Sequence, residues 1–429
     1  MAEREPIGVI GTGYVGLVTA AGFAELGSDV WCVDIDAAKI ERLKAGEVPI
    51  HEPGLDEVIA RNKERLHFTT DLAPALEAAR LLFVAVGTPP THSGDADLSA
   101  VNAVVDAMPA SDRHALVMKS TVPVGTGATV KRKFAEQDKG FSYVSCPEFL
   151  KEGSALKDFL HPDRVVIGDD GDWAGEAVSE LYAPLNAPII RTDIASAEMV
   201  KLASNAFLAT KISFINEIAN VCEETGADVV EVAKGMGYDE RIGSAFLRPG
   251  IGFGGSCFPK DVSALKQLAG NSGYHFQLLN SVIEVNELQK RRVVGKLEKH
   301  LGTLIGKKIA LLGLAFKPDT DDMREASSLV LAARLQAAGA EVSAFDPIAE
   351  EAARPLLSGV EMTDSAMAAL EGADAVVLVT EWSEFKDLDW TAVASSMAGD
   401  VIIDGRNHLD GDAVRAAGLA YEGVGRGGS

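Results

Sequence analysis

The run with the clearest chemical potential is glycine-rich and reads Gly252-Phe253-Gly254-Gly255-Ser256-Cys257-Phe258-Pro259-Lys260-Asp261. Lys260 and Asp261 follow Cys257 directly and lead into a helical pattern, so we expect Cys257 close to a helix start. A nearby cation and a helix N-terminus both lower the pKa of a thiol and favour the thiolate, which is the nucleophilic form. The run therefore predicts an accessible cysteine that attacks an electrophilic carbon.

The other cysteines, Cys32, Cys146 and Cys222, lie far apart, and no pair has C-x-x-C spacing. This argues against a metal site and against a disulfide framework. We expect Cys32 in a core strand and Cys222 within a long helix, where each packs as a small buried side chain. The sequence has no long apolar run and no signal-peptide core at its start, so a cytoplasmic location is the default expectation.

A second motif, glycines 11, 13 and 16 in Gly11-Thr12-Gly13-Tyr14-Val15-Gly16, follows an apolar strand and opens a helical pattern. In a dinucleotide site the first glycine permits a tight turn, the second admits the pyrophosphate, and the third lets helix and strand pack closely. Asp34 lies 18 residues after Gly16 at the end of a second strand, where a carboxylate accepts from both ribose hydroxyls of NAD and repels the phosphate of NADP. A glycine turn in an unrelated α/β fold is the competing interpretation.

A nucleophilic cysteine beside a nicotinamide suggests aldehyde chemistry, with a thiohemiacetal, a thioester and a hydrolysis step. Such chemistry needs carboxylates or a water network. Glu148 and Glu152 are four residues apart and would share a face if they began a helix; a solvated charged turn is the alternative. Lys201 and Asn205 have the same spacing in an otherwise apolar helix, where a lysine is costly unless it has a partner. Both pairs also fit a structural role.

Alternation of apolar runs and helical patterns fills the two ends of the chain and predicts parallel, doubly wound sheets. We expect strands at 7–10, 30–33, 81–86, 116–119 and 141–145 in the first third, and at 308–312, 341–345, 375–380 and 401–404 in the last third. The strand-end segments Val86-Gly87-Thr88-Pro89 and Ser120-Thr121-Val122-Pro123 would then face a ligand crevice.

The middle of the chain reads as helical, from about 195 to 225 and again from about 262 to 301, with an interruption near 270–273. The predicted fold class is therefore α/β, with two Rossmann-like doubly wound domains joined by a long central helix. The predicted parts are an NAD-binding domain (1–194), a helical segment with the cysteine loop (195–301), a second Rossmann-like domain (302–422) and a flexible tail (423–429). The second domain has Gly313-Leu314-Ala315-Phe316 in place of a triple-glycine loop, so we expect it not to bind a dinucleotide in the same way.

The composition and net charge of the chain limit the classes of molecule that it can bind. The chain has 429 residues, 47% of them hydrophobic, and a net charge of −23, so it is a globular multidomain protein that repels nucleic acid and anionic lipid. An anionic substrate would need its own local cations.

Taken together, these segments resemble the UDP-glucose 6-dehydrogenase family within the wider nucleotide-sugar dehydrogenases. Further matches are Glu52-Pro53-Gly54-Leu55, Pro147-Glu148-Phe149-Leu150, Lys201-Leu202-Ala203-Ser204-Asn205-Ala206-Phe207, Gly313-Leu314-Ala315-Phe316-Lys317, Arg324-Glu325-Ala326 and Asp404-Gly405-Arg406-Asn407. The resemblance spans nearly the whole chain. It implies two Rossmann-like domains, a homodimer, and oxidation of a sugar C6 alcohol to a carboxylate with NAD.

The resemblance also implies catalytic roles. Cys257 would hold the thiohemiacetal and thioester, and Lys201 and Asn205 would stabilise the oxyanion. Asp261 would help to activate water. Thr121, Glu148 and Glu152 would hold or activate the hydrolytic water, with Glu152 as the base.

Binding positions carry over in the same way. The implied cofactor contacts are Gly11, Gly13, Tyr14, Val15, Gly16, Asp34, Lys39, Thr88, Thr121, Glu152, Lys260 and Arg324. The implied substrate contacts are Glu148, Phe149, Leu150, Lys151, Glu152, Lys201, Asn205, Arg241, Phe246, Leu247, Gly250, Gly254, Lys317 and Arg406. Arg241 matches an arginine that reaches across a dimer. Lys317, Arg406 and Arg241 would be the cations that a pyrophosphate-bearing substrate such as UDP-glucose requires.

Other interpretations remain. GDP-mannose 6-dehydrogenase has the same chemistry on another nucleotide, and a non-catalytic nucleotide-sugar-binding protein is a remote alternative. The sequence departs from the family at Cys146, where asparagine is common. We hypothesise that oxidation links Cys146 to Cys257 and silences the site.

Overall fold

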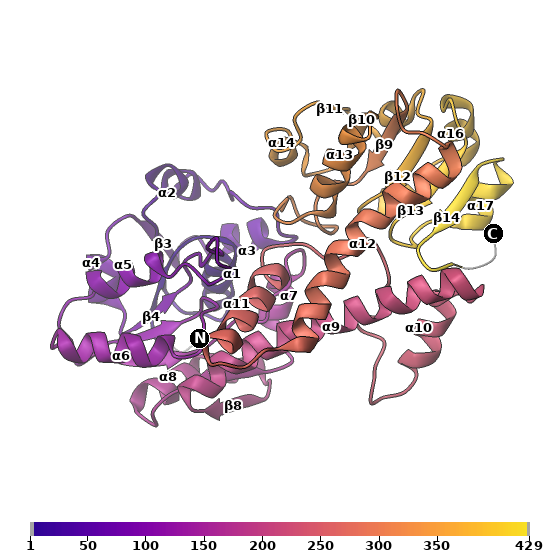
Figure 1. Cartoon of the computed structure of the whole chain (residues 1–429). Coiled ribbons are helices and arrows are strands. Elements are labelled where there is room, and N and C mark those ends of the chain that lie inside the picture. The colour runs from indigo at the N-terminus through magenta and orange to yellow at the C-terminus, as the bar shows by residue number, and fades with distance from the viewer. Residues whose placement is uncertain (1–3, 427–429) are drawn as a thin grey trace. The chain divides into compact units, whose positions relative to one another are not determined.

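The computed structural model describes residues 4–426. Its packing divides the chain into two compact units (Figure 1). Unit 1 comprises the described residues up to 204 together with 263–274, and unit 2 comprises 205–262 and the described residues from 275 onward. The boundary falls within helix α9 (Ile194–Thr225), which is continuous from one unit into the other.

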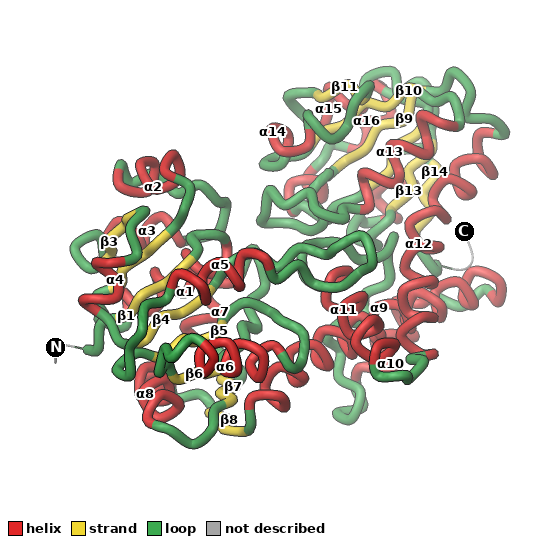
Figure 2. Tube along the Cα trace, turned by 60° about the vertical axis from the view of Figure 1, so that its left-hand side comes forward, coloured by secondary structure: helices red, strands yellow, loops and turns green. Residues whose placement is uncertain are grey.

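Unit 1 is built on one sheet with the strand order β3-β2-β1-β4-β5-β6-β7-β8, eight strands within the described residues. Figure 2 shows these strands side by side with helices around them. Neighbouring strands are parallel except for β6 and β7, which meet antiparallel. The strands are β1 (Ile7–Ile10), β2 (Val30–Val33), β3 (Leu66–Thr69), β4 (Leu81–Val84), β5 (Ala115–Met118), β6 (Ser142–Ser145), β7 (Val165–Gly168) and β8 (Ile189–Thr192).

Helices cover both faces of this sheet. The helices are α1 (Tyr14–Glu25), α2 (Ala37–Lys44), α3 (Leu55–Arg61), α4 (Ala73–Ala78), α5 (Ser99–Ala107), α6 (Thr126–Glu136), α7 (Ala155–Leu160), α8 (Trp173–Tyr182) and the short 3₁₀ helix η1 (Ala183–Leu185). Strand β4 shows how burial on both faces affects the amino-acid sequence of a central strand. Leu81 and Phe83 belong to the core on one face and Leu82 and Val84 to the core on the other, all fully buried. A central parallel strand therefore reads as a continuous apolar run.

Unit 2 repeats this plan with the strand order β11-β10-β9-β12-β13-β14, six strands among the described residues and all parallel. The strands are β9 (Lys308–Leu312), β10 (Glu341–Phe345), β11 (Val360–Met362), β12 (Ala375–Leu378), β13 (Val401–Asp404) and β14 (Ala420–Gly423). The helices that follow α9 are α10 (Val229–Gly237), α11 (Phe258–Asn271), α12 (Gln277–Leu301), α13 (Ser327–Ala337), α14 (Glu350–Ala353), α15 (Ala366–Leu370), η2 (Ser383–Asp387), α16 (Trp390–Ser396) and α17 (Gly411–Ala416).

The predicted fold class is confirmed, and the predicted strands are found with ends that shift by at most two residues. Strands β3, β7, β8, β11 and β14 were missed. Four of them, β3, β8, β11 and β14, lie at sheet edges and are only partly buried, which weakens the apolar signal. The expectation of a purely parallel first sheet is wrong at the β6–β7 junction. The three-part division of the chain stays a prediction.

The expectation of a flexible tail from residue 423 is wrong within the described residues. Gly423 belongs to β14, Val424 is buried in the core, and Arg426 forms an ion pair with Asp228. Residues 427–429 lie outside the described part.

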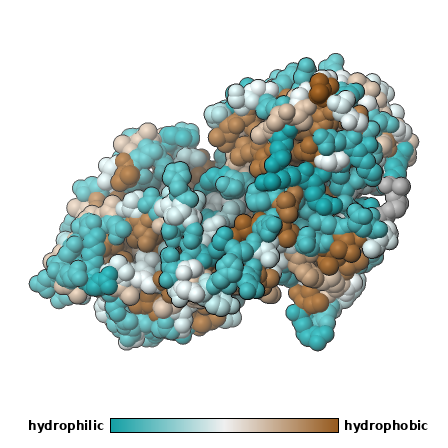
Figure 3. Space-filling model, in the orientation of Figure 1, coloured by the Kyte–Doolittle hydropathy of each residue, from teal (hydrophilic) through white to brown (hydrophobic). Residues whose placement is uncertain are grey.

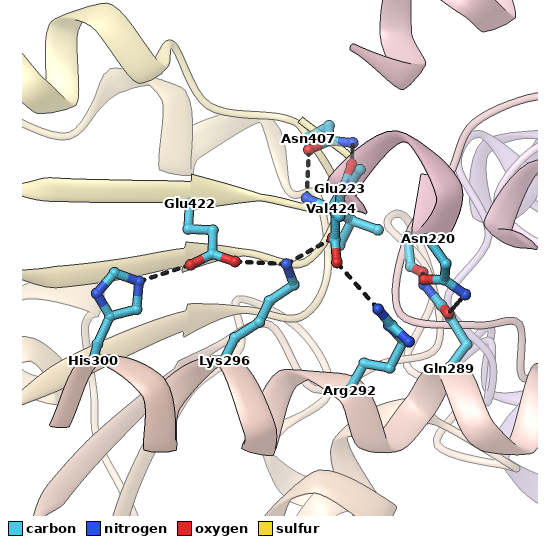
Figure 4. A network of polar contacts seen from close by, with 11 residues as sticks. Asn220, Glu223, Gln289, Arg292, Lys296, His300, Asn407, Glu422 and Val424 are labelled. Carbon is cyan, nitrogen blue, oxygen red and sulfur yellow. Dashed lines mark hydrogen bonds and ion pairs between the residues drawn. The ribbon is translucent and has the colours of Figure 1, made fainter. Parts of the chain in front are cut away.

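A polar network fixes β14 to the helices of unit 2 (Figure 4). Lys296 of α12 donates to Glu223 of α9 and to Glu422 of β14, both at 2.6 Å, and His300 also contacts Glu422. Burial raises the pKa of both carboxyls, but the lysine contacts outweigh burial and hold each pKa below its ordinary value. The two carboxylates are therefore charged at neutral pH, and their contacts with Lys296 tie α9 to the second sheet.

Candidate functional site

The Gly11–Gly16 loop lies between β1 and α1, where the strand order of the first sheet reverses. Gly11 has φ +95°, and a Cβ there would lie 2.6 Å from the carbonyl oxygen of Ala85. A Cβ on Gly16 would lie 1.8 Å from the oxygen of Gly11, whereas one on Gly13 would meet no atom within 4 Å. The first and third glycines are thus required by packing. The open space at Gly13 is what a pyrophosphate at a helix N-terminus needs.

Asp34 follows β2 directly and is buried. Its carboxylate accepts hydrogen bonds from the backbone and hydroxyl of Thr12, at 2.8 and 2.7 Å, and from the ammonium of Lys39, at 3.0 Å. Burial raises the pKa of Asp34, but the backbone N–H of Asp36, Thr12 and Lys39 together lower it to about 2. The carboxylate is therefore charged at neutral pH, as a group that selects NAD over NADP must be. Sequence reasoning missed Thr12, because a threonine between two glycines carries no spacing signal.

The second sheet has Asp346 at the corresponding place, and it is used differently. Its buried carboxylate accepts from the backbone N–H groups of Leu314 and Ala315 and from the indole of Trp382. All three donors reach one oxygen, Oδ2, and the other oxygen accepts from the backbone N–H groups of Ile348 and Ala349. The predicted difference in dinucleotide binding between the two Rossmann-like units stays a prediction.

The strand-end loops after β4 and β5 are joined. The Thr88 hydroxyl donates to the carbonyl of Thr121 at 2.9 Å, and the Ser120 hydroxyl donates to the carbonyl of Val86 at 2.7 Å. Thr88 and Thr121, both predicted site residues, therefore lie together at the carboxyl edge of the sheet.

Glu148 and Lys201 form a buried ion pair, with Lys201 Nζ 2.9 Å from Glu148 Oε1 and side chains only 4% and 5% exposed. The backbone N–H of Leu150 donates to the other carboxylate oxygen at 2.5 Å. Burial raises the pKa of Glu148, but the charge and hydrogen bond of Lys201, the Leu150 N–H and the charge of Lys119 outweigh it and lower the pKa. The partner that Lys201 was predicted to need is thus Glu148.

The idea that Glu148 and Glu152 share a helix face is wrong. The segment from Pro147 to Gly153 forms no helix, and α7 begins only at Ala155. Gly153 has φ +76°, and its N–H donates to the phenol of Tyr14 at 2.8 Å and to Glu52 at 2.7 Å. Tyr14, predicted as a cofactor contact, therefore also anchors the segment that carries both carboxylates.

The cysteine loop lies in unit 2, and Cys257 directly precedes α11 as predicted. Its thiol is partly exposed, and the Ser256 hydroxyl lies 3.5 Å from the sulfur. The loop is held closely. A Cβ on Gly254 would lie 2.1 Å from the oxygen of Glu325, and the Gly255 N–H donates to the carbonyl of Arg324 at 2.9 Å.

Asp261 is fully buried one turn into α11. Its carboxylate accepts from the Asn205 amide and from the Lys260 ammonium, both at 2.6 Å. Three predicted residues thus form one chain of polar contacts within unit 2, and two of them, Lys260 and Asp261, follow Cys257 closely in the sequence.

The predicted binding residues of unit 2 differ in their surroundings. Arg406 donates to the carbonyls of Val379 and Gly252, so it supports the cysteine loop, and Gly250 packs against the neighbouring Gly405. Phe246 has φ +64°, an unfavourable conformation for a bulky residue that is common at functional sites. The exposed Arg241 and Arg324 pair with nearby aspartates. Leu247 is buried, and the Lys317 ammonium lies 5.2 Å from the ring of Phe316.

The remaining predicted residues of unit 1 lie on the 147–153 segment and on α1. Lys151 is exposed and pairs with Asp158 at 2.7 Å, while Phe149, Leu150, Glu152 and Val15 are partly buried.

All four cysteines are free thiols, and Cys32 and Cys222 are buried as expected. Cys146 is also fully buried, with the Lys119 ammonium 3.7 Å from its sulfur. A disulfide between Cys146 and Cys257 remains a hypothesis.

Comparison with known proteins agrees with this architecture. Three sequence profiles match in order: the NAD-binding domain (residues 5–186), the central domain (195–288) and the UDP-binding domain (310–411) of the UDP-glucose/GDP-mannose dehydrogenase family. The chain belongs to this family. The dehydrogenase therefore uses NAD, which fits the open space at Gly13 and the charged Asp34.

Individual relatives cover almost the whole dehydrogenase. It is 48% identical to the UDP-glucose 6-dehydrogenase TuaD of Bacillus subtilis, over 98% of this chain and 93% of that one. It is 47% identical to a UDP-glucose 6-dehydrogenase of Pseudomonas aeruginosa, over 97% of each chain. A UDP-glucose dehydrogenase structure from Pyrobaculum islandicum, 40% identical, matches with a TM-score of 0.91 over 98% of both chains. No helix among residues 4–426 is long and apolar enough to cross a membrane.

Replacing Asp34 tests the cofactor site. Asp34→Asn removes the charge that repels a 2′-phosphate and weakens the acceptor for the ribose. We expect the KM for NAD to rise about tenfold, or ~1.4 kcal/mol, and the ratio of kcat/KM for NADP to that for NAD to increase. Steady-state kinetics with both cofactors measures this. Glu41→Gln, which neutralises an exposed carboxylate on α2, is the control and should change neither value.

Proposed function

We propose that this dehydrogenase oxidises UDP-glucose to UDP-glucuronate in two steps that pass through a covalent bond to Cys257. The observation that carries the proposal is the partly exposed thiol directly before α11, the helix whose buried Asp261 accepts from Lys260 and Asn205. A dehydrogenase that only makes an aldehyde needs no nucleophile at this place. The names of relatives about 48% identical over almost the full chain support UDP-glucose as the substrate.

The chemistry balances as two oxidations and one hydrolysis. The C6 alcohol loses a hydride and a proton to become an aldehyde, and the thiolate of Cys257 adds to that aldehyde to form a thiohemiacetal. Loss of a second hydride gives a thioester, and water then cleaves the C–S bond to release a carboxylate and the thiolate. NAD held at the Gly11–Gly16 loop would supply the hydride acceptor, one molecule for each oxidation, so two NADH would form for each sugar.

The catalytic groups have separate roles in this proposal. Lys201 and Asn205, one turn apart on α9, stabilise the oxygen anion, since each presents N–H donors. Their own partners, Glu148 and Asp261, are buried carboxylates that keep these donors oriented. Glu152 is the base that activates the hydrolytic water, and Glu148 and Thr121 hold that water.

Substrate binding has to overcome the net charge of −23. Lys317 and Arg406, together with Arg241 of a second copy, are the cations that we assign to the pyrophosphate. Phe149, Leu150, Lys151, Phe246, Leu247, Gly250 and Gly254 line the remainder of the site. The cytoplasmic location expected from the sequence belongs to the same proposal.

The stoichiometry of NADH tests the reaction. UDP-glucose should yield two NADH per sugar consumed, and GDP-mannose should yield none. Cys257→Ser should lower turnover by at least a hundredfold, because serine is a far weaker nucleophile at neutral pH. Absorbance at the NADH band, with the sugar product quantified, measures both. One NADH per sugar, or full turnover by Cys257→Ser, would refute the thioester route, and turnover of GDP-mannose alone would refute the substrate.

We also propose that the enzyme is a homodimer that associates through α9. Phe207, Phe214 and Val221 recur every seven residues along this helix and are 66%, 49% and 56% exposed. A seven-residue spacing places them on one face, as in a helix that pairs with another helix. Figure 3 shows brown, apolar side chains over the region of α9 and α10 in unit 2. A second copy would cover this stripe and bring its Arg241 to the partner's site.

Phe214→Glu tests the dimer, because a charge in the centre of the stripe opposes burial. Light scattering after size-exclusion chromatography should give a two-chain mass for the wild type and a one-chain mass for the variant. Arg291→Gln, which makes the same change in charge at an exposed position of α12, should remain a dimer. A one-chain mass for the wild type contradicts the proposal.

A further inference from the structure

Unit 1 contains a pocket of about 380 Å³ next to the Glu148–Lys201 pair. It is lined by the 147–151 segment, by α7 and by the residues that lead into β7. Arg164, the last residue before β7, lies in its wall and is half-buried. The functions assigned above give Arg164 no role, although a half-buried arginine loses solvation that some contact has to replace.

Contact with the ring of Phe149 replaces the solvation that Arg164 loses. The Arg164 guanidinium carbon lies 3.6 Å from the ring centroid, which is close enough for direct stacking. The Lys201 ammonium lies 5.4 Å from the same centroid, so two cations lie against one ring. A partly desolvated guanidinium over an aromatic face is among the stronger contacts of this kind.

The stack lies in the middle of a segment that forms no regular secondary structure. Residues 146–150 form neither helix nor strand, yet Glu148 must keep its Lys201 contact at 2.9 Å and the Leu150 N–H contact at 2.5 Å. Phe149 is the residue between these two anchors. Rotation of its ring and backbone would move the Glu148 carboxylate away from Lys201.

We propose that Arg164 is a positioning residue, whose guanidinium clamps Phe149 and thereby keeps the Glu148 carboxylate on Lys201. The proposal rests on the proposed function only for its effect on turnover; the clamp itself is a property of unit 1 alone. Arg164 does not touch the reacting atoms in this proposal and acts through Phe149.

The charges around Glu148 determine the direction in which its pKa is expected to change when Arg164 is replaced. Three cations act on the Glu148 carboxylate: Lys201 from α9, Lys119 from the end of β5, and Arg164 from the start of β7. Asp163, beside Arg164, is the opposing acidic neighbour. Loss of the clamp loosens the Lys201 contact and removes one cation, so the lowered pKa of Glu148 rises. The acid side of the activity profile should therefore move to higher pH.

Three variants test the clamp. Arg164→Met keeps an unbranched apolar stem but loses the charge and the plane, Arg164→Lys keeps the charge alone, and Arg132→Met makes the same change at an exposed position of α6. Hydrogen–deuterium exchange of the peptide that contains Leu150 should accelerate at least tenfold in Arg164→Met and less in Arg164→Lys. Arg132→Met should match the wild type.

Kinetics supply the second readout. In Arg164→Met we expect kcat/KM for UDP-glucose to fall about tenfold, the acid limb to shift upward, and the KM for NAD to stay within twofold of the wild-type value. For Arg164→Lys, kcat/KM and the position of the acid limb should lie between those of the wild type and those of Arg164→Met. Unchanged exchange at Leu150 in a folded Arg164→Met protein overturns the clamp, and so does an unshifted acid limb. If the wild type forms no NADH from UDP-glucose, the proposed function fails, whereas the exchange result still decides the clamp.

Discussion

The structure depends on one constraint, which is that charge removed from water must be matched by a partner. The Glu148–Lys201 ion pair shows this most plainly, because both side chains are almost completely buried and each would be costly alone. Asp261 is satisfied by Asn205 and Lys260, and Asp34 by Thr12 and Lys39. In every case the partner also fixes the orientation of the charged group, so the groups proposed for catalysis are held in place before any ligand binds.

The sheets position some of these groups, and helices α9 and α11 supply Lys201, Asn205, Lys260 and Asp261. A parallel, doubly wound sheet collects the carboxyl ends of its strands at one edge, and the loops after β1, β2, β4, β5 and β6 carry the proposed residues of unit 1. The second sheet does the same for Arg406 and the segment around Lys317. Helix α9 contributes Lys201 to one set and Asn205 to the other, since the boundary between the units falls between them. The arrangement of strands and helices, more than the local sequence of any one loop, therefore determines which of these groups lie together.

Much of this was accessible from sequence, for identifiable reasons. Central strands such as β4 and β12 are short, wholly apolar runs, and the glycines at 11 and 16 are required by close backbone contacts that no other residue permits. The 147–153 segment was misjudged because i, i+4 spacing matters only inside a helix. Here Gly153 adopts a left-handed conformation, and the Glu148 carboxylate accepts a backbone N–H of its own loop. The contacts of Thr12, Glu52 and Arg164 were missed because spacing along the chain does not encode tertiary contacts.

The central claim is that Cys257 carries the sugar as a thioester, and it is tested most directly by mass spectrometry of the trapped intermediate. Glu152→Gln, which slows hydrolysis if Glu152 is the base, would be mixed with UDP-glucose and NAD and quenched in acid. We predict that the peptide containing Cys257 gains the mass of a UDP-glucuronyl group and that hydroxylamine removes it, as expected of a thioester. An unmodified Cys257 peptide in a sample that has already formed NADH would contradict the account.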